Sequence, residues 1–343
     1  MISRYHRQEL LPQIGTAGQQ KIQSANVALI GCGALGTVVA EHLVRAGVGT
    51  LRLIDRDIVE WTNLQRQTLY TEADAREGAA KVFASAERLK QINSKIQIEP
   101  IAADLDAENI EKVLGFSTTR RPDLILDGTD NIETRYLIND VAVKHGVPWV
   151  YAAGVGTEGR VMGIVPGISP CLRCIFPDAP AAGDLATCDT AGVLAPVTAV
   201  IASLAVVQAF KILLGDHPRH LISVDAWKDD FRSMDIEHCR DVNCVCCGKN
   251  NFEFLNRAVR RESARLCGRD AVQVYASGCP DLAGLAQRLS NSGEIRRTPY
   301  MLRIALHDPA GITLSIFPDG RAIIAGTCDI ARARSVAARF LGS

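Results

Sequence analysis

The sequence predicts an α/β protein: a doubly wound, mostly parallel sheet extended by antiparallel strands, followed by a small α+β unit. Three observations support this fold class. Short apolar strands alternate with helical stretches from residue 24 to about 150, a glycine-rich strand pair follows, and a second series of strand and helix signals begins near residue 267. Such alternation is typical of a parallel sheet that is covered by helices.

The first series alternates strands and helices. We expect strands at 26–31, 50–55, 95–102, 123–127 and 147–152, and helices at 16–24, 34–46, 78–92, 106–114 and 133–145. The glycine-rich pair of strands from Ala153 to Pro166 adds the antiparallel part. The loop from Pro177 to Thr190 is rich in Ala, Pro, Gly and Asp, a composition typical of mobile loops.

The stretch from Val193 to Phe210 is almost wholly apolar, so it is first compared with a membrane span. It contains Pro196, Thr198, Ser203 and Gln208 and barely reaches the roughly 20 residues that a bilayer requires. A helix that is apolar on every side otherwise lies in a core or between subunits. We therefore expect a central helix packed against the sheet or a partner.

The first domain is expected to cover residues 1–250 and to close near the Cys244–Gly248 segment, with a polar linker after it. Residues 251–343 would form the small α+β domain, whose role the sequence does not reveal. Asp319-Gly320 between alternating apolar residues is a strong hairpin signal. The expected elements of this domain are a strand at 271–275, a helix at 281–290, a strand at 300–306, a hairpin at 312–324 and a helix at 329–341.

Composition narrows the possible functions. The 343 residues include 38 basic and 38 acidic side chains, so no bulk positive charge is available to hold nucleic acid. The first residues lack the apolar segment of a secretion signal, which points to a cytoplasmic protein. The 11 cysteines then suggest metal or thiol chemistry before a disulfide framework.

A glycine-rich loop is the strongest local signal. The apolar strand Val27–Ile30 runs into Gly31-Cys-Gly33-Ala34-Leu-Gly36, and the next strand ends in Asp55. Glycines let the backbone approach a phosphate, the following helix offers free N–H groups, and the acid can hydrogen-bond a ribose hydroxyl. This order predicts a Rossmann-like nucleotide site; the alternative is a glycine turn that only packs helix against sheet.

Two cysteine pairs predict a metal site. Cys171 and Cys174, and then Cys244 and Cys247, have the spacing of two zinc knuckles and could supply four thiolates to one tetrahedral zinc. No coordination position would remain open, so the zinc would be structural. Buried free cysteines or a redox pair are the alternatives, and Cys246 could substitute as a ligand.

Asp127-Gly-Thr-Asp130-Asn131 follows an apolar strand, which places its side chains at the edge where open parallel sheets bind ligands. A carboxylate facing a triphosphate there would hold Mg²⁺. The alternative is an Asp that caps the helix beginning near Ile132.

Taken singly, Arg7, Arg66 and Lys81 are more typical of solvated surface charges than of a binding site. Together with a glycine loop they become candidates for neutralising a triphosphate, because bringing in a carboxylate costs roughly 4 kcal/mol per charge pair at 4 Å and an effective dielectric of 20.

With these motifs together, residues 4–248 resemble the ubiquitin-activating-enzyme-like adenylyltransferases of sulfur-carrier pathways, the ThiF/MoeB family. The tail, with Phe317–Arg321 and Gly326–Ile330, looks like that of the longer thiazole-biosynthesis members. The motifs that carry the resemblance are Arg4-Tyr-His-Arg7-Gln8, Gly31–Gly36, Asp55-Arg-Asp57, Asn63-Leu-Gln-Arg66-Gln67, Lys81, Asp127–Asn131, both cysteine pairs and Ala186-Thr-Cys188-Asp-Thr-Ala-Gly192.

The resemblance implies ATP-dependent adenylation of the C-terminal glycine of a small ubiquitin-fold, ThiS-like sulfur carrier, with Mg²⁺ as cofactor. Asp55 would bind the ribose and Asp130 the magnesium, whereas Arg7 would reach ATP from the other subunit of a homodimer. Cys188 matches a loop cysteine that only some relatives use covalently. The nucleotide-binding set would be Gly31, Gly33, Ala34, Gly36, Asp55, Asp57, Asn63, Arg66, Lys81, Asp130 and Asn131.

Other functions stay open at this point. The carrier could be MoaD-like or belong to cysteine, tRNA-thiolation or natural-product pathways, and the chain could be a non-catalytic carrier-binding subunit. An NAD-dependent oxidoreductase would use the same glycine loop and Asp55, but it would not need Arg66, Lys81 and Asp130 around a triphosphate. No rhodanese-like segment is evident, so another protein would deliver sulfur.

Overall fold

The computed structural model describes residues 3–118, 120–180, 188–259, 264–265, 270–276, 278 and 280–342. By its contacts the chain divides into two units, residues 1–258 and residues 259–343, and each is described by itself.

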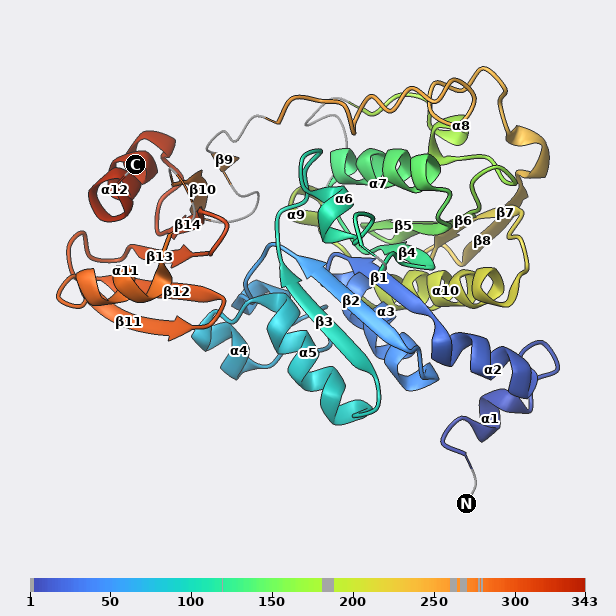
Figure 1. Cartoon of the computed structure of the whole chain (residues 1–343), viewed down its shortest axis with the longest axis horizontal. Coiled ribbons are helices and arrows are strands. Elements are labelled where there is room, and N and C mark those ends of the chain that lie inside the picture. Colours follow the sequence, from blue (N-terminus) through green and yellow to red (C-terminus); the bar gives the residue numbers. More distant parts are fainter. Residues whose placement is uncertain are drawn as a thin grey trace. The chain divides into compact units, whose positions relative to one another are not determined.

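An eight-stranded sheet forms the centre of the larger unit, with the strand order β3-β2-β1-β4-β5-β6-β7-β8 (Figure 1). The first five strands in this order are parallel and the last three pairings are antiparallel. The bounds are β1 Asn26–Ile30, β2 Thr50–Asp55, β3 Gln97–Ala102, β4 Leu124–Asp127, β5 Trp149–Val155, β6 Glu158–Ile164, β7 His220–Asp225 and β8 Asp230–Asp235. The predicted fold class, a mostly parallel sheet extended by antiparallel strands, is confirmed.

The register aligns the carboxyl ends of the central strands. Ile30 of β1 lies beside Ile54 of β2 and Asp127 of β4. The loops that follow β1, β2 and β4 therefore leave the sheet at one edge, where ligands bind in open α/β sheets.

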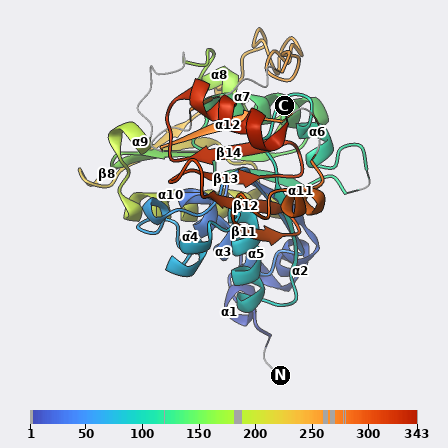
Figure 2. The same ribbon diagram turned by 90° about the vertical axis from the view of Figure 1, so that its left-hand side faces the viewer.

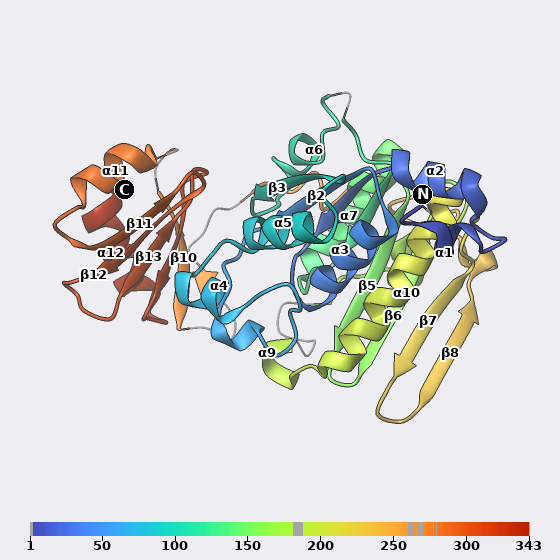
Figure 3. The ribbon, with the colours of Figure 1, turned by 90° about the horizontal axis from the view of Figure 1, so that it is seen from below.

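Helices cover both faces of this sheet at its centre, where β1 and β4 are buried and apolar on both sides. On one face lie α3 (Ala34–Ala46), α5 (Lys81–Ile92) and α10 (Ala195–Leu214); on the other lie α6 (Ile110–Val113) and α7 (Ile132–His145) (Figures 1 and 3). Along β1, Val27 and Leu29 belong to the first core, whereas Ala28 and Ile30 belong to the second.

Several boundaries differ from the sequence-based expectations. The predicted helix at 78–92 is wrong at its start, because Gly78 ends a separate helix, α4 (Glu72–Glu77), at φ 61°, and α5 begins only at Lys81. The predicted helix at 106–114 is reduced to α6. Short helices also occur at α1 His6–Glu9, α2 Gly15–Ser24, α8 Leu172–Ile175, α9 Cys188–Ala191, η1 Trp61–Asn63 and η2 Glu237–Cys239.

The apolar stretch forms α10, which extends to Leu214 and ends at Gly215 with φ 93°. Within the described ranges, α10 is the one helix that is long and apolar enough to cross a membrane; its most apolar 18 residues have a mean hydropathy of 2.1, and 44% of them are buried. The helix packs against α3, β5 and β6 and supplies Ile201, Ala205 and Ala209 to the core. This packing is what a core helix was expected to show.

The smaller unit is a six-stranded antiparallel sheet with the order β11-β12-β13-β14-β10-β9, packed against two helices through one apolar core (Figure 2). The predicted hairpin at Asp319-Gly320 joins β13 to β14, with Gly320 at φ 86°. Strand β11 was not predicted. The bounds are β9 Ala264–Arg265, β10 Ala271–Tyr275, α11 Leu282–Arg288, β11 Gly293–Thr298, β12 Met301–Leu306, β13 Thr313–Ile316, β14 Arg321–Ala325 and α12 Ile330–Leu341.

The two units differ in charge. Residues 259–343 contain 12 arginines, no lysine and 7 acidic residues, a net charge of +5 in a chain whose total is zero. Residues 1–258 therefore carry −5.

Candidate nucleotide site and metal centre

Two glycines of the loop after β1 are required by the packing of the protein itself. Gly31 has φ +92°, and a Cβ there would lie 2.6 Å from the carbonyl of Gly128. A Cβ at Gly36, in the first turn of α3, would lie 1.9 Å from the carbonyl oxygen of Gly31. The packing interpretation of the glycine turn therefore holds for these two positions, and by itself it indicates no ligand.

Gly33 is different. Its φ is −86°, and a Cβ there would meet nothing closer than 4.0 Å. Gly33 is also the N-cap of α3 and offers no side chain to the first N–H groups of the helix, which have no intrahelical partner. The space in front of Gly33 and Ala34 is thus open to an anion, the ligand that a helix N-terminus prefers.

Gln67 places a hydrogen-bond acceptor without a partner in the described residues beside this space. Its side chain is 4% exposed, yet among the described residues its Oε1 has no hydrogen-bond partner. Its Nε2 lies 4.0 Å from the position that a Cβ on Gly33 would occupy. The sequence placed Gln67 in a motif but not in the predicted site; the signal that identifies it is a buried amide with an unused oxygen.

Asp55, at the end of β2, fastens the glycine loop to its neighbour. One carboxylate oxygen accepts the N–H of Cys32 at 2.6 Å and the other accepts the N–H of Asp57 at 2.7 Å. Burial raises the pKa of Asp55, and the positive charge of Lys81 opposes that rise. The carboxylate therefore holds the end of β2 beside the glycine loop.

Lys81 is fixed against the same strand end. Its Nζ lies 3.1 Å from Oδ2 of Asp57, its backbone N–H donates to the Asp57 carbonyl at 2.9 Å, and its side chain is 5% exposed. A buried lysine ammonium near a glycine loop provides a fixed positive charge at the start of α5.

Asn63 and Arg66 lie in the turn after β2. Asn63 is buried and its Oδ1 accepts the N–H of Glu60 at 3.0 Å, while Arg66 donates to the carbonyl of Thr62 at 2.8 Å. Arg66 has no ion pair within the described part of the chain. Both side chains are held by their own turn here, and nothing else in the described residues engages the Arg66 charge.

Three polar side chains of the Asp127–Asn131 segment, those of Asp127, Asp130 and Asn131, have different surroundings. Asp127 is buried and pairs with Arg135 at 3.0 Å; burial raises its pKa and Arg135 opposes this. Asn131 caps α7 by accepting the Thr134 N–H at 3.1 Å, so the capping residue is Asn131 and not an aspartate. Asp130 is exposed and, in the described residues, forms no hydrogen bond or ion pair.

These groups lie together at one edge of the sheet. The contact of Gly31 with Gly128 joins the glycine loop to the loop that carries Asp130. Arg56, which the sequence prediction did not include, pairs with Asp104 at 3.2 Å and is close enough to Asp130 for their charges to interact. This edge therefore combines the open backbone before Gly33 with positively charged side chains. It also carries one carboxylate, that of Asp130, which forms no hydrogen bond or ion pair in the described residues.

Arg7 is not brought to this edge within its own chain. Tyr5 and Gln8 fasten α1 beside the far end of α3: the Tyr5 ring lies against Gly47, and Gln8 donates to Gln19 at 2.6 Å. Since α3 has 13 residues, its two ends lie about 20 Å apart. Arg7 is exposed there and has no partner within the described residues.

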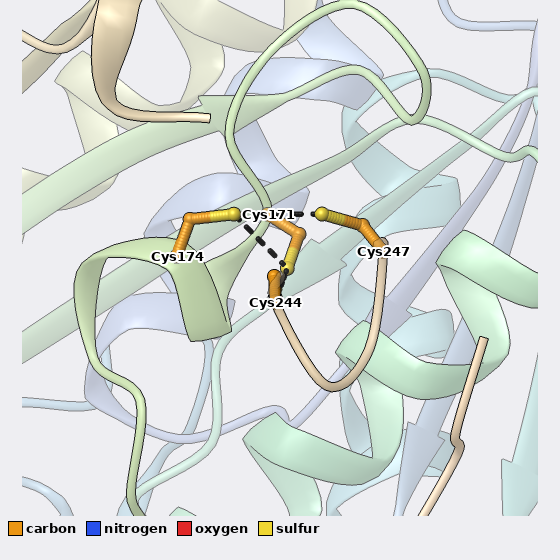
Figure 4. Close-up of side chains that lie close together, drawn as sticks. All are labelled: Cys171, Cys174, Cys244 and Cys247. Carbon is orange, nitrogen blue, oxygen red and sulfur yellow. Dashed lines mark hydrogen bonds between the residues drawn. The ribbon is translucent and has the colours of Figure 1, made fainter. Parts of the chain in front are cut away.

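The four predicted cysteines converge on one point. Figure 4 shows their side chains gathered together: Cys171 precedes α8, Cys174 lies in it, and Cys244 and Cys247 come from the turn at residues 244–247; the four Sγ atoms lie within 4.8 Å of one another. Three pairs are 3.4, 3.6 and 3.9 Å apart. A tetrahedral zinc with Zn–S bonds near 2.3 Å would space its sulfurs about 3.8 Å apart, so the donor set fits zinc.

The loop that carries Cys188 is only partly described. Residues 181–187, which belong to the predicted mobile loop, lie outside the described residues, and Cys188 begins α9. The chain then returns to the sheet at Gly156, which exchanges backbone hydrogen bonds with Gly192 and Leu194 at 2.9 and 2.8 Å.

Known proteins resemble the chain over its whole length. A model of the ThiF family matches residues 5–246. The chain is 42% identical to the sulfur carrier protein ThiS adenylyltransferase of Bacillus subtilis over 346 aligned residues, which cover 100% of both chains. It is 38% identical over 255 residues to a sulfur carrier protein adenylyltransferase of Thermus thermophilus, covering 72% of this chain and 91% of that one.

Among solved structures, E. coli MccB with AMPCPP and MccA has a TM-score of 0.62 and 25% identity, and the likeness covers 72% of this chain and 74% of that chain. The solved structure supports the architecture of the larger unit. Because the family model spans residues 5–246 and the Bacillus relative aligns from end to end, the chain belongs to the ThiF family.

Proposed function

We propose that this chain is a sulfur-carrier adenylyltransferase: it uses ATP to adenylate the C-terminal glycine of a ThiS-like, ubiquitin-fold carrier for thiazole formation in thiamine biosynthesis. The observation that carries the proposal is the 42% identity to a ThiS adenylyltransferase over the full length of both chains. The alignment includes residues 259–343, so the likeness extends beyond the motifs of the nucleotide site.

ATP is proposed to lie across the glycine loop, with its phosphates in the open space before Gly33 and the N-terminus of α3. Lys81 and Arg66 supply positive charge to the phosphates, and Asp55 accepts a ribose hydroxyl. Asp130 holds Mg²⁺, which when bound neutralises charge on the phosphate oxygens. The lack of any other bond to Asp130 in the described residues supports this role. Asn63, Asp57, Ala34 and Asn131 complete the proposed nucleotide-binding set.

The reaction joins two negatively charged groups. The carrier carboxylate attacks the α-phosphorus of ATP, a C–O–P bond forms, and pyrophosphate leaves with the bonding electron pair. The protein supplies position and positive charge and no nucleophile. We therefore propose that Cys188 takes no part in the adenylation step and acts on the activated carrier.

A homodimer completes the site. The position of Arg7 about 20 Å from Gly33, at the other end of α3, supports its reaching ATP in the neighbouring subunit. The four gathered cysteines would hold a structural zinc that ties α8 to the turn at 244–247. A cytoplasmic location suits this site, because thiols stay reduced there.

Other carriers remain the second candidate, since the Thermus relative is named only as a sulfur carrier protein adenylyltransferase. A non-catalytic partner subunit is disfavoured by the presence of the glycine loop, Lys81 and Asp130 in one chain. The residues 259–343 are proposed to stabilise the enzyme or to dock the carrier.

The experiment incubates the full chain with ATP·Mg²⁺ and purified candidate carriers and detects the AMP adduct by mass spectrometry. In parallel, ATP–pyrophosphate exchange is measured for two variants. Asp130→Ala should lower exchange by at least about 10²-fold, because charge stabilisation of the phosphates is lost. Cys188→Ala should leave exchange unchanged. Equal loss in both variants would refute this division of roles, and thermal stabilisation by NAD but not by ATP·Mg²⁺ would refute the nucleotide assignment.

A further inference from the structure

One side chain of α7 contacts both of the chain segments that carry the cysteine pairs. Asn139 is 0% exposed. Its Oδ1 accepts the N–H of Leu172 at 2.9 Å, inside the first pair, and its Nδ2 donates to Sγ of Cys246 at 3.2 Å, inside the second pair. A single buried amide thus links two segments that are more than seventy residues apart in the chain.

The hydrogen bond from Asn139 gives a role to Cys246, the cysteine that lies within the second pair but is not one of the four predicted ligands. Cys246 is 0% exposed and its sulfur does not belong to the group of four that lies within 4.8 Å. The four predicted cysteines therefore form the group with metal-binding spacing, and the sulfur of Cys246 lies outside that group but close enough to Cys171 to interact with it. The Cys246 sulfur acts as the acceptor through which Asn139 holds the second pair.

The neighbouring residue fixes the chain that leaves the second pair. Oδ2 of Asp140 accepts the N–H groups of Phe254 and Leu255 at 2.8 and 3.3 Å. Asn139 and Asp140 are both 0% exposed and lie in the middle of α7. A buried polar group in a helix is costly unless it is hydrogen-bonded. Here both polar atoms of the Asn139 side chain and Oδ2 of Asp140 bind this region, while Oδ1 of Asp140 has no hydrogen-bond partner among the described residues.

We propose that Asn139 is a positioning residue for the zinc site: it holds the two cysteine pairs at metal-binding separation. The inference rests on the proposed zinc. The physical reason is that four thiolates repel one another and must be ordered before a metal can gain four bonds at once. A rigid bridge between the pairs carries part of that ordering, as outer hydrogen bonds do at metal sites generally.

The test compares zinc release from the purified full chain with that of two variants. Zinc content is measured by elemental mass spectrometry, and release to a chromogenic chelator is followed with time. Asn139→Leu keeps the side-chain volume and all four ligands but removes the bridge, and release should accelerate about 10- to 100-fold.

Asn93→Leu is the matched control. Asn93 is also 0% exposed and also bridges two segments, donating to Tyr5 and to the Val44 carbonyl at 3.0 Å each, but it lies at the far end of α5. It should lower the melting temperature by a similar amount while zinc release keeps the wild-type rate. Equal acceleration in both variants would mean that general destabilisation is the cause, and the proposal would be overturned.

Cys246→Ala covers the case in which Asn139→Leu does not fold, as judged by circular dichroism. It should retain one zinc per chain and release it several-fold faster than the wild type. Loss of zinc stoichiometry in Cys246→Ala would identify Cys246 as a ligand and overturn the proposal. A zinc-free wild-type protein would reject the metal assignment itself, whereas bound zinc with unchanged release in Asn139→Leu would reject only the role of Asn139.

Discussion

The polar groups at the carboxyl ends of the parallel strands (the carboxyl edge of the sheet) and at their amino ends (the amino edge) are used differently. At the carboxyl edge, Gly33 faces open space, Gln67 has an oxygen without a partner, and Asp130 forms no hydrogen bond or ion pair within the described residues. Toward the amino edge, Arg52 pairs with Glu99 at 2.9 Å and also donates to the carbonyl of Leu114 at 2.6 Å. The polar groups at the carboxyl edge are available to a ligand, whereas those at the amino edge bind one another and stabilise the fold.

A hollow of about 170 Å³ shows why shape alone would mislead. It lies at the amino edge, and its lining includes Arg52, Glu99 and Arg120. These charges bind one another, since Arg120 also reaches Glu99 at 3.4 Å. The comparison teaches that a ligand site in this fold is better recognised by polar groups without partners than by a surface hollow alone.

The first prediction concerns Arg7. This residue lies toward the amino edge of the sheet, although its proposed role is at the carboxyl edge, where ATP would bind. Arg7→Ala and Asp130→Ala should each be nearly inactive, with losses of about 10³-fold if the arginine acts as such residues do in phosphoryl transfer. After the two variants are mixed and allowed to exchange subunits, ATP–pyrophosphate exchange should recover to about one quarter of the wild-type value, because half of the dimers then contain one intact site. No recovery in a mixture shown to contain heterodimers would contradict the action of Arg7 across the dimer.

The second prediction separates two glycines that are three residues apart. Gly33→Ala places a methyl in open space, so stability should fall by only about 1 kcal/mol, the usual cost at an N-cap, while exchange activity falls by about 10²-fold. Gly36→Ala forces a methyl against the Gly31 carbonyl and should cost about 3 kcal/mol of stability. Chemical denaturation and exchange kinetics check both. Wild-type activity in Gly33→Ala would show that no phosphate lies there.

The third prediction concerns the amino edge. Arg52→Met removes the buried partner of Glu99 and leaves it only the exposed Arg120, so the free energy of unfolding should fall by about 3 kcal/mol, the lower end of the cost of breaking a buried ion pair. The kcat and KM for ATP should stay at their wild-type values at temperatures where the variant is folded. A raised KM would mean that the two edges are not independent.

The sequence alone supported much of the first unit. Strand β1, the glycine loop and α3 were predicted within one residue, because both faces of a parallel sheet require continuous apolar strands and because Gly31 and Gly47 mark the ends of these elements. The prediction of the ThiF/MoeB family was confirmed by the family model and by the full-length relative.

Other features left no readable pattern. Five of the six residues of β8 are exposed, so the strand has no buried apolar face that a sequence pattern could reveal. The same holds for much of β11. The use of Asn139 depends on contacts between three distant segments, which spacing cannot reveal. The roles of the predicted nucleotide-binding residues, of Arg7 and of Cys188 stay predictions until the variants are measured.

The division of charge between the two units has a practical consequence. A chain with zero net charge would usually pass through ion exchangers near neutral pH, but residues 1–258 and 259–343 carry −5 and +5. We expect both cation and anion resins to retain the protein at low ionic strength. Desalting should promote association between molecules through their opposite charges, and about 0.1 M salt, with a Debye length near 10 Å, should keep them apart.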